Sequence, residues 1–268
     1  MRRAAVLGRP VAHSLSPVLH RAAYAALGLT DWTYDALDIG PEDLPVLLAG
    51  LGEEWRGFSV TMPCKQAAVD VADVVEPLPR LLHAANTLVR TDAGWRAENT
   101  DVGGIGMALQ LAGVQDVGTA TLIGAGGTAA AAAVALSSLG AEHVDVVVRT
   151  PSRAGDVTRV LDVLGVPFTV TPLPEAALEA PLVVSTVPIG AQPDLLHLPW
   201  RGEHTVLDVL YAPWPTPLAE RVTAVGGTVA SGLDVLFWQA TAQVELMTGL
   251  PAPIAAMRSA LDAALDAR

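Results

Sequence analysis

Residues 117–141 constrain the fold more than any other stretch, because they carry no charged side chain over 25 consecutive positions. A helix of that length would be long enough to span a bilayer. However, Gly124, Gly126 and Gly127 interrupt the run, with β-branched residues before them and alanines after them. This order predicts a buried strand, a tight turn and a helix, so we expect no membrane-spanning segment.

The turn has the pattern Gly-x-Gly-x-x-Ala, which is typical of a dinucleotide site when a strand precedes it and a helix follows. The first glycine permits the sharp turn, the second lets a pyrophosphate approach the backbone, and the small last residue lets helix and strand pack closely. With a second strand expected at 144–148, the sequence predicts a Rossmann-type, doubly wound α/β domain. The predicted cofactor residues in the turn are Gly124, Ala125, Gly126, Gly127 and Thr128.

The end of that second strand indicates which dinucleotide binds. An NAD site usually has Asp or Glu there, which binds the ribose hydroxyls. This chain instead has Arg149, Thr150 and Arg153. Two guanidinium groups suit a 2′-phosphate, which they hold by charge and by paired hydrogen bonds. We therefore predict NADP as the cofactor, and the alternative is a solvated basic turn.

The overall composition limits the class of partner. With 268 residues, 51% of them apolar and 16% charged, the chain is expected to form a compact α/β protein. The net charge of -12 argues against nucleic acids and anionic membranes as partners. The single cysteine, Cys64, leaves no internal disulfide and is typical of a cytoplasmic protein. We expect a small-molecule substrate, and the sequence leaves the oligomeric state open between monomer and homodimer.

Lys65 is the only lysine in a chain with fifteen arginines. A site that uses an ammonium in this background needs a group that can lose and regain a proton, which guanidinium does not. A strand is expected at 57–60, and Pro63 is expected to start a helix that runs to about Val75. Lys65 then lies in the first helical turn, where the helix dipole favours the neutral amine. We predict that Lys65 is a general acid/base; a stray surface lysine is the alternative.

The first predicted loop follows a strand expected at 4–7 and carries two serines. Open α/β sheets bind ligands in loops at the carboxyl ends of their strands. Ser14 is therefore a candidate ligand-binding residue, whereas Ser16, which is followed by proline, is equally suited to capping a helix. His13 and His20 have no third ligand at a useful spacing, so we predict no metal site.

Two further polar residues lie at predicted boundaries between elements. Asn86 stands at the beginning of a hairpin expected over 84–97, where a turn residue is also common. Asp101 immediately precedes a helix and has the residue type of an N-cap. From the residues alone, both positions are open to a structural explanation.

Taken together, the motifs resemble those of the shikimate dehydrogenase family over essentially the whole chain. The matching segments, in the family's order, are 8–20, 59–65, 84–88, 99–101, 124–127 with 149–150, and 232–236 with 239. The resemblance implies two α/β domains, a substrate-binding domain over 1–100 and 237–268 and an NADP-binding Rossmann domain over 101–236. It implies hydride transfer between NADP(H) and the pair 3-dehydroshikimate and shikimate, in the biosynthesis of aromatic amino acids.

The resemblance also implies a role for each matching residue. Ser14 and Ser16 would hold the substrate carboxylate, and Lys65 and Asp101 would form the acid/base pair. The ring hydroxyls would be bound by Thr61, Asn86, Asp101 and Gln239. Tyr211 would lie near the nicotinamide and the substrate. Thr186 and Gly232 complete the predicted cofactor site.

Besides Val235, which replaces a frequent Met and is interpreted as a packing change, three positions depart from the family's pattern. Ser59 replaces the usual Asn, Ala130 stands where Arg is frequent, and Val148 replaces the Asn before the Arg-Thr pair. The last two changes each remove a potential cofactor contact. The alternative functions are a paralogue that acts on quinate or an amino analogue, with NAD as a possible cofactor, and a non-catalytic protein that binds NADP or a metabolite.

Overall fold

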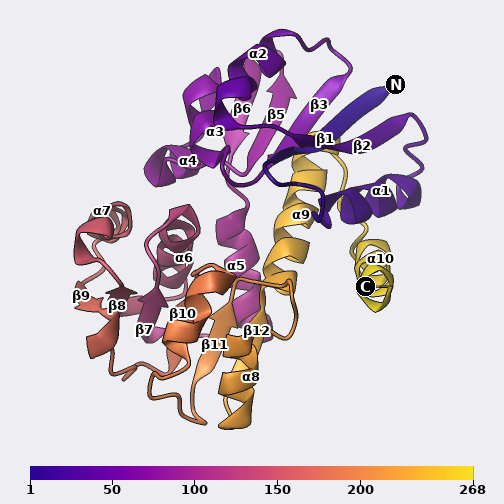
Figure 1. The fold of residues 1–268 in the computed structure, drawn as a ribbon. Helices are drawn as coiled ribbons and strands as arrows, with labels where there is room; N and C mark the ends of the chain where they lie inside the picture. Colours follow the sequence, from indigo (N-terminus) through magenta and orange to yellow (C-terminus); the bar gives the residue numbers. More distant parts are fainter. Residues whose placement is uncertain (268) are drawn as a thin grey trace. The chain divides into compact units, whose positions relative to one another are not determined.

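The computed structural model describes residues 1–267, and the contacts within it divide the chain into two compact units. Unit 1 contains Met1–Thr100 and the chain from Gln239 onward, and unit 2 contains Asp101–Trp238. Each unit is built on its own six-stranded sheet with helices packed against it (Figure 1). This arrangement confirms the predicted α/β fold class.

The sheet of unit 1 is mixed and has the strand order β2-β1-β3-β5-β6-β4. Strands β1 and β2 run parallel to each other, as do β1 and β3, whereas β5 is antiparallel to both β3 and β6. The strands are β1 (Arg2–Gly8), β2 (Trp32–Asp38), β3 (Trp55–Val60), β4 (Val74–Val75), β5 (Thr87–Thr91) and β6 (Gly94–Glu98).

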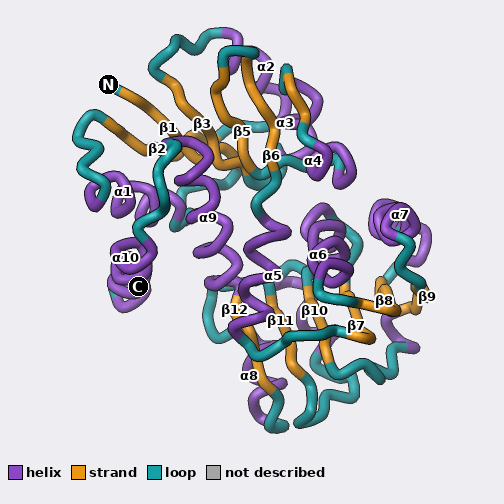
Figure 2. Tube along the Cα trace, turned by 180° about the vertical axis from the view of Figure 1, so that it is seen from behind, coloured by secondary structure: helices purple, strands orange, loops and turns teal. Residues whose placement is uncertain are grey.

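Helices cover the unit 1 sheet and bury an aromatic core. The rings of Trp55 and Phe58 stack with centroids 5.0 Å apart, and those of Phe58 and Trp95 lie 5.2 Å apart. Helix α1 packs against the C-terminal helix α10, as Figure 1 and Figure 2 show. The helices are α1 (Ser16–Ala26), the short turn η1 (Pro41–Asp43), α2 (Leu44–Ala49), α3 (Lys65–Val71), α4 (Pro77–Leu82), the second part of α9 (Gly232–Thr248) and α10 (Ile254–Asp266).

The sheet of unit 2 is entirely parallel, with the order β12-β11-β10-β7-β8-β9. Read from β9 and numbered within the unit, this is the order 3-2-1-4-5-6 of a dinucleotide-binding Rossmann fold, and the order reverses between β7 and β10. The strands are β7 (Gly118–Ile123), β8 (Ala141–Val148), β9 (Phe168–Pro172), β10 (Leu182–Ser185), β11 (Thr205–Asp208) and β12 (Thr228–Ser231). Their central residues are largely buried, as expected for a parallel sheet covered on both faces.

The helices of unit 2 follow its strands. Helix α6 packs on β7 and β8, and α8 packs on β11 and β12 (Figure 2). The helices are α5 (Asp101–Leu111), α6 (Gly127–Ser138), α7 (Gly155–Leu164) and α8 (Pro217–Ala224), with the short turns η2 (Pro151–Arg153), η3 (Leu173–Glu175) and η4 (Ile189–Leu195).

Two predicted helix boundaries are wrong. The helix expected from Pro63 to about Val75 covers only Lys65–Val71, because Val74 and Val75 pair with β6 as a short strand. Residues 231–236 suggest a turn that leads into a helix over 237–248, but helix α9 begins at Gly232. The Ser231 hydroxyl accepts a hydrogen bond from the Leu233 N–H, and this bond stabilises the earlier turn.

Candidate active site

The register of the unit 1 sheet gathers the predicted substrate residues at one end. Ser59 in β3 lies opposite Val6 in β1 and opposite Thr87 in β5, and Thr87 lies opposite Glu98 in β6. Since β5 is antiparallel to β3 and β6, the start of β5 lies beside the carboxyl ends of the other strands. The loops at this end, with the first residues of the helices α1 and α3 that follow them, carry Ser14, Ser16, Thr61, Lys65 and Asn86.

The two serines of the first loop contact each other, and Ser16 also contacts Tyr34 of β2. The Ser14 hydroxyl oxygen accepts a 3.2 Å hydrogen bond from the backbone N–H of Ser16. Ser16 is the first residue of α1, whose N-cap is Leu15, so the capping explanation of Ser16 is wrong. Burial raises the pKa of the Tyr34 phenol, while hydrogen bonds with the hydroxyls of Ser59 and Ser16 act in the opposite direction.

Lys65 is the first residue of α3, which agrees with its predicted place in the first helical turn. The Thr61 N–H donates to the Leu7 carbonyl at 2.8 Å, and this bond joins the loop before α3 to β1. The Lys65 carbonyl accepts a 2.9 Å hydrogen bond from the Ala85 N–H. The backbone of Lys65 is therefore tied to the residue that precedes Asn86.

The side-chain amide of Asn86 is buried, with 2% of the residue exposed. Its Oδ1 accepts from the Thr87 hydroxyl at 2.9 Å and from the Thr100 N–H at 2.7 Å. Its Nδ2 donates to the Thr100 hydroxyl at 2.8 Å and to Oε1 of Gln239 at 3.2 Å. An amide has two donors and two acceptor lone pairs, so these bonds use its full capacity. The bond to Gln239 links two predicted substrate residues and is the longest of these bonds.

Asp101 and Tyr211 lie in unit 2. Asp101 is the first residue of α5, directly after Thr100, and its carboxylate there suits the helix dipole. Tyr211 lies in the loop between β11 and α8. Asp208 fixes both ends of this loop, because it accepts hydrogen bonds from the Thr216 hydroxyl at 2.6 Å and from the Leu210 N–H at 3.2 Å.

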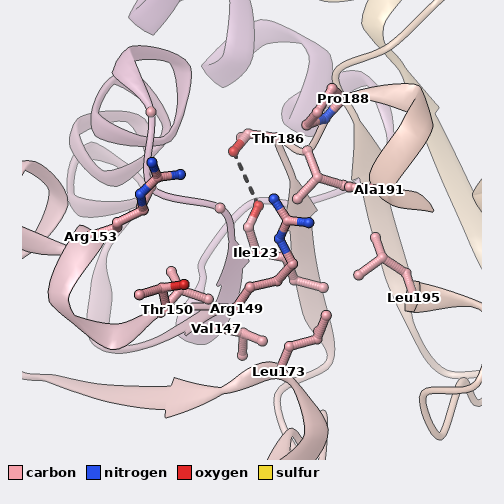
Figure 3. Close-up of a pocket in the computed structure, with 15 residues that line it drawn as sticks. Ile123, Val147, Arg149, Thr150, Arg153, Leu173, Thr186, Pro188, Ala191 and Leu195 are labelled. Atoms are coloured by element: carbon pink, nitrogen blue, oxygen red, sulfur yellow. Dashed lines mark hydrogen bonds between the residues drawn. The ribbon is translucent and has the colours of Figure 1, made fainter. Parts of the chain in front are cut away.

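A pocket of about 530 Å³ lies in unit 2 at the ends of β7, β8 and β10, where the strand order reverses (Figure 3). Parallel sheets bind ligands at this switch point. The predicted cofactor residues that line the pocket are Gly124, Ala125, Gly126, Arg149, Thr150, Arg153 and Thr186. The predicted residues outside its lining are Gly127, Thr128 and Gly232.

The glycine turn leaves backbone accessible at the start of α6. Gly124 has a φ of +122°, and a Cβ there would collide with the hydroxyl of Thr186, which itself donates to the Ile123 carbonyl at 3.1 Å. A Cβ on Gly126, the N-cap of α6, would meet nothing within 4 Å. The N-terminus of α6 therefore has room for a phosphate next to its free N–H groups.

The part of the pocket that follows β8 is positively charged. Arg149, Thr150 and Arg153 are exposed on the loop after β8, and Figure 3 shows both arginine side chains beside the pocket. None of the residues that line the pocket in the described chain is acidic, although the protein as a whole carries a charge of -12. This local excess of positive charge suits a phosphate group.

Gly232 has a structural reason to be glycine. A Cβ there would lie 2.8 Å from the Leu210 carbonyl oxygen and closer still to that of Val209. The start of α9 therefore lies directly against the loop that carries Tyr211. The contact places Gly232 beside that loop and outside the pocket's lining.

Comparisons with known proteins identify the family. Residues 6–88 match the shikimate dehydrogenase substrate binding domain, and residues 232–261 match the shikimate 5'-dehydrogenase C-terminal domain. A shikimate dehydrogenase (NADP(+)) of Moorella thermoacetica is 37% identical over 98% of this chain and 93% of its own length. The chain belongs to the shikimate dehydrogenase family.

Solved structures of the family agree with this assignment. The shikimate dehydrogenase of Mycobacterium tuberculosis is 46% identical, with a TM-score of 0.88 over 98% of this chain and 100% of that one. The Thermus thermophilus enzyme, solved in complex with NADP(H) and shikimate, is 34% identical with a TM-score of 0.84, over 98% of this chain and 100% of that one.

A buried polar network lies next to Asn86, one of the predicted substrate residues. The sequence did not predict this network. Ser59, where shikimate dehydrogenases usually have Asn, donates a 2.6 Å hydrogen bond to Oε1 of Gln243 and accepts one from the Tyr34 phenol. His20 is fully buried, stacks on the Tyr34 ring at 4.1 Å, and lies 3.4 Å from Oε1 of Gln243. The available signal was the four-residue spacing of Gln239 and Gln243, which places both on one face of α9.

The other two departures lie in unit 2. Val148 lines the pocket as an apolar surface, and Ala130 is completely buried in α6. Within residues 1–267, no group of three or more His, Cys, Asp and Glu side chains is placed to hold a metal ion. No helix in the same range combines the length and the apolar composition needed to cross a membrane.

Proposed function

We propose that the protein is an NADP-dependent oxidoreductase that interconverts 3-dehydroshikimate and shikimate in the biosynthesis of aromatic amino acids, in the cytoplasm. The observation that carries the proposal is the position of the only lysine. Lys65 starts α3, and its carbonyl is bonded to the segment that carries Asn86. Full-length relatives named as NADP-dependent shikimate dehydrogenases support the same reaction. In this proposal unit 1 is the substrate-binding domain and unit 2 is the NADP-binding domain.

NADP would be held by the pocket of unit 2. The N–H groups of Gly126, Gly127 and Thr128 would contact the pyrophosphate, since a Cβ on Gly126 would meet nothing within 4 Å. Arg149 and Arg153 would hold the 2′-phosphate, and Thr150 would add a hydroxyl donor. Further cofactor contacts are assigned to Gly124, Ala125, Thr186 and Gly232. When bound, the nicotinamide supplies or accepts the hydride.

The substrate would be held at the end of the unit 1 sheet. Ser14 and Ser16 would donate hydrogen bonds to the carboxylate. The ring hydroxyls would be bound by Thr61, Asn86, Gln239 and Asp101, with Tyr211 next to the ring. The fixed orientation of the buried Asn86 amide supports this assignment, because a preorganised donor loses little freedom when substrate binds.

The remaining chemistry is a proton transfer. Reduction of a ring ketone creates negative charge on its oxygen, and a lysine can deliver the proton that neutralises it. We assign this role to Lys65, and we assign to Asp101 the roles of orienting Lys65 and binding the reacting hydroxyl. In the direction of oxidation, Lys65 takes the proton back.

The test is an absorbance assay of nicotinamide reduction that crosses shikimate and quinate with NADP and NAD. We expect rapid turnover with shikimate and NADP alone. Turnover mainly with quinate or NAD would assign the chain to the paralogue, and no turnover in any combination would favour a binding protein. Sedimentation of the same preparation would distinguish a monomer from a homodimer.

A further inference from the structure

Gln243 is the centre of the polar network, and its neighbours determine the orientation of its amide. Its Nε2 donates 3.0 Å hydrogen bonds to the backbone carbonyl of Asn86 and to the Thr87 hydroxyl. Since a carbonyl can only accept, Nε2 must face Asn86, and Oε1 must face Ser59 and His20. The residue has 1% of its surface exposed, so no solvent competes for these bonds.

The same bonds dock helix α9 on the start of β5. Gln239 lies one helical turn before Gln243, and its Oε1 accepts from Nδ2 of Asn86 at 3.2 Å. Gln243 therefore holds the backbone of Asn86 while Gln239 meets its side chain. The Thr87 hydroxyl accepts from Nε2 of Gln243 and therefore donates its own proton to Oδ1 of Asn86. The Thr100 N–H, a donor only, binds the same oxygen. As a result, Asn86 presents a donor to Gln239, and Gln239 presents an acceptor to Asn86.

We propose that Gln243 is a positioning residue that holds Asn86 and Gln239 as a donor–acceptor pair of fixed polarity, which selects a ring hydroxyl over an amine. This inference rests on the proposed function, in which these two residues bind a ring hydroxyl. The substrate hydroxyl would replace the bond between them, accepting from Nδ2 of Asn86 and donating to Oε1 of Gln239.

The selection follows from the donors and acceptors available. A hydroxyl both donates and accepts, so it satisfies the two amides together. An alkyl amine is protonated at neutral pH and has donors only. The ammonium group would place its own N–H against the Nδ2–H of Asn86. The Asn86 donor would then be buried without an acceptor, which costs free energy. The pair should therefore disfavour amino analogues of shikimate at the ring position that meets it.

The experiment compares Gln243→Met, which has a similar volume, and Gln243→Glu, which is isosteric but loses the Nε2 donor. Val244→Ala is the control, because Val244 is a fully buried neighbour on α9 with no hydrogen-bonding side chain. The substrates are shikimate and analogues in which each ring hydroxyl in turn is replaced by an amine. Thermal stability and NADP affinity are measured alongside.

We expect both Gln243 variants to raise KM for shikimate about tenfold with a smaller change in kcat, since about 1.4 kcal/mol corresponds to tenfold. The preference for hydroxyl over amine at one ring position should shrink by a similar factor, and NADP affinity should stay the same. Val244→Ala should lower the melting temperature without changing that preference. An unchanged preference in both Gln243 variants, or an equal loss in Val244→Ala, would overturn the proposal.

A ligand-free measurement separates this inference from the proposed function. In wild-type protein and in Val244→Ala, the side-chain amide protons of Asn86 should exchange slowly with solvent by NMR, and in Gln243→Met they should exchange faster. Inactivity of the wild-type protein toward shikimate would refute the proposed function but not this result. Equal exchange in all three proteins would refute the role of Gln243.

Discussion

The two candidate binding regions hold their polar groups in opposite ways. At the end of the unit 1 sheet, the amides of Asn86 and Gln243 are buried and hydrogen-bonded to protein partners. In the pocket of unit 2, the side chains of Arg149 and Arg153 are exposed, and a Cβ on Gly126 would meet nothing within 4 Å. Unit 1 therefore depends on preorganised side chains, and unit 2 depends on backbone and local charge.

This contrast separates two kinds of sensitivity to mutation. A buried amide that loses its partner incurs the full cost of an unsatisfied group, so changes in the network of unit 1 should affect both stability and substrate binding. An exposed arginine contributes little to the free energy of folding, so substitutions in the pocket of unit 2 should change the affinity for the cofactor and leave stability almost unchanged. Substitutions in each region test this division.

Lys65→Met should lower kcat by about 100-fold or more, the usual scale for the loss of a general acid/base. The backbone bond between Lys65 and Ala85 does not depend on the side chain, so KM for shikimate should change less than kcat. Steady-state kinetics in both directions measure the effect. Wild-type turnover in this variant would remove Lys65 from the chemistry.

Arg149→Ala should raise KM for NADP by about 10- to 100-fold, because it removes charged hydrogen bonds worth about 1.5–3 kcal/mol. KM for NAD and the melting temperature should hardly change. Arg221→Ala is the matched control, since Arg221 is also exposed on unit 2 but does not line the pocket. A parallel rise for NADP and NAD would show that Arg149 does not read the 2′-phosphate.

Ser14→Ala should lower the affinity for shikimate about tenfold, because one hydrogen bond to the substrate carboxylate is lost. It also removes the acceptor for the Ser16 N–H, so a small loss of stability is expected. Separate titrations with shikimate and with NADP measure the effect. Unchanged affinity for shikimate, or reduced affinity for NADP, would contradict the assignment of Ser14 to the substrate.

Local sequence signals predicted most of the fold. The strands expected at 4–7 and 144–148 lie within β1 and β8, and Gly124 has the positive φ that the tight turn requires. Strand β4 was missed because its two residues form a strand only by pairing with β6. Helix α7, which begins at a glycine and has no capping side chain, was not predicted either.

The candidate site was less accessible to sequence reasoning, because its geometry depends on contacts far apart in the chain. The Asn86–Gln239 bond spans 153 positions, and the Ser59–Gln243 bond spans 184. Residue types and the family's motifs indicated Asn86 and Gln239, whose roles stay predictions. Nothing local indicated that Gln243, through the Thr87 hydroxyl, and the Thr100 N–H together orient the Asn86 amide.

His20→Phe keeps a ring against Tyr34 and tests how the stability of the network depends on pH. Burial lowers the pKa of His20 to about 3 from the ordinary 6.5, so the folded protein holds this imidazole neutral. The unfolded chain binds a proton below pH 6.5 and the folded chain does not. The contribution of His20 to stability is therefore complete above pH 6.5 and is lost as the pH falls toward 3.

Asp208 in unit 2 should affect the free energy of unfolding with the opposite sign as the pH falls. Burial raises its pKa, and protonation relieves the cost of a buried charge.

Urea unfolding of the wild-type protein and of His20→Phe at pH 7 and pH 5 measures the contribution of His20. Between pH 7 and pH 5, the free energy of unfolding of the wild-type protein should fall by about 2 kcal/mol more than that of His20→Phe. The change is about 1.4 kcal/mol for each pH unit below the unfolded pKa of 6.5. Equal losses would mean that His20 takes up its proton without unfolding, and the network around Gln243 would then be open to solvent.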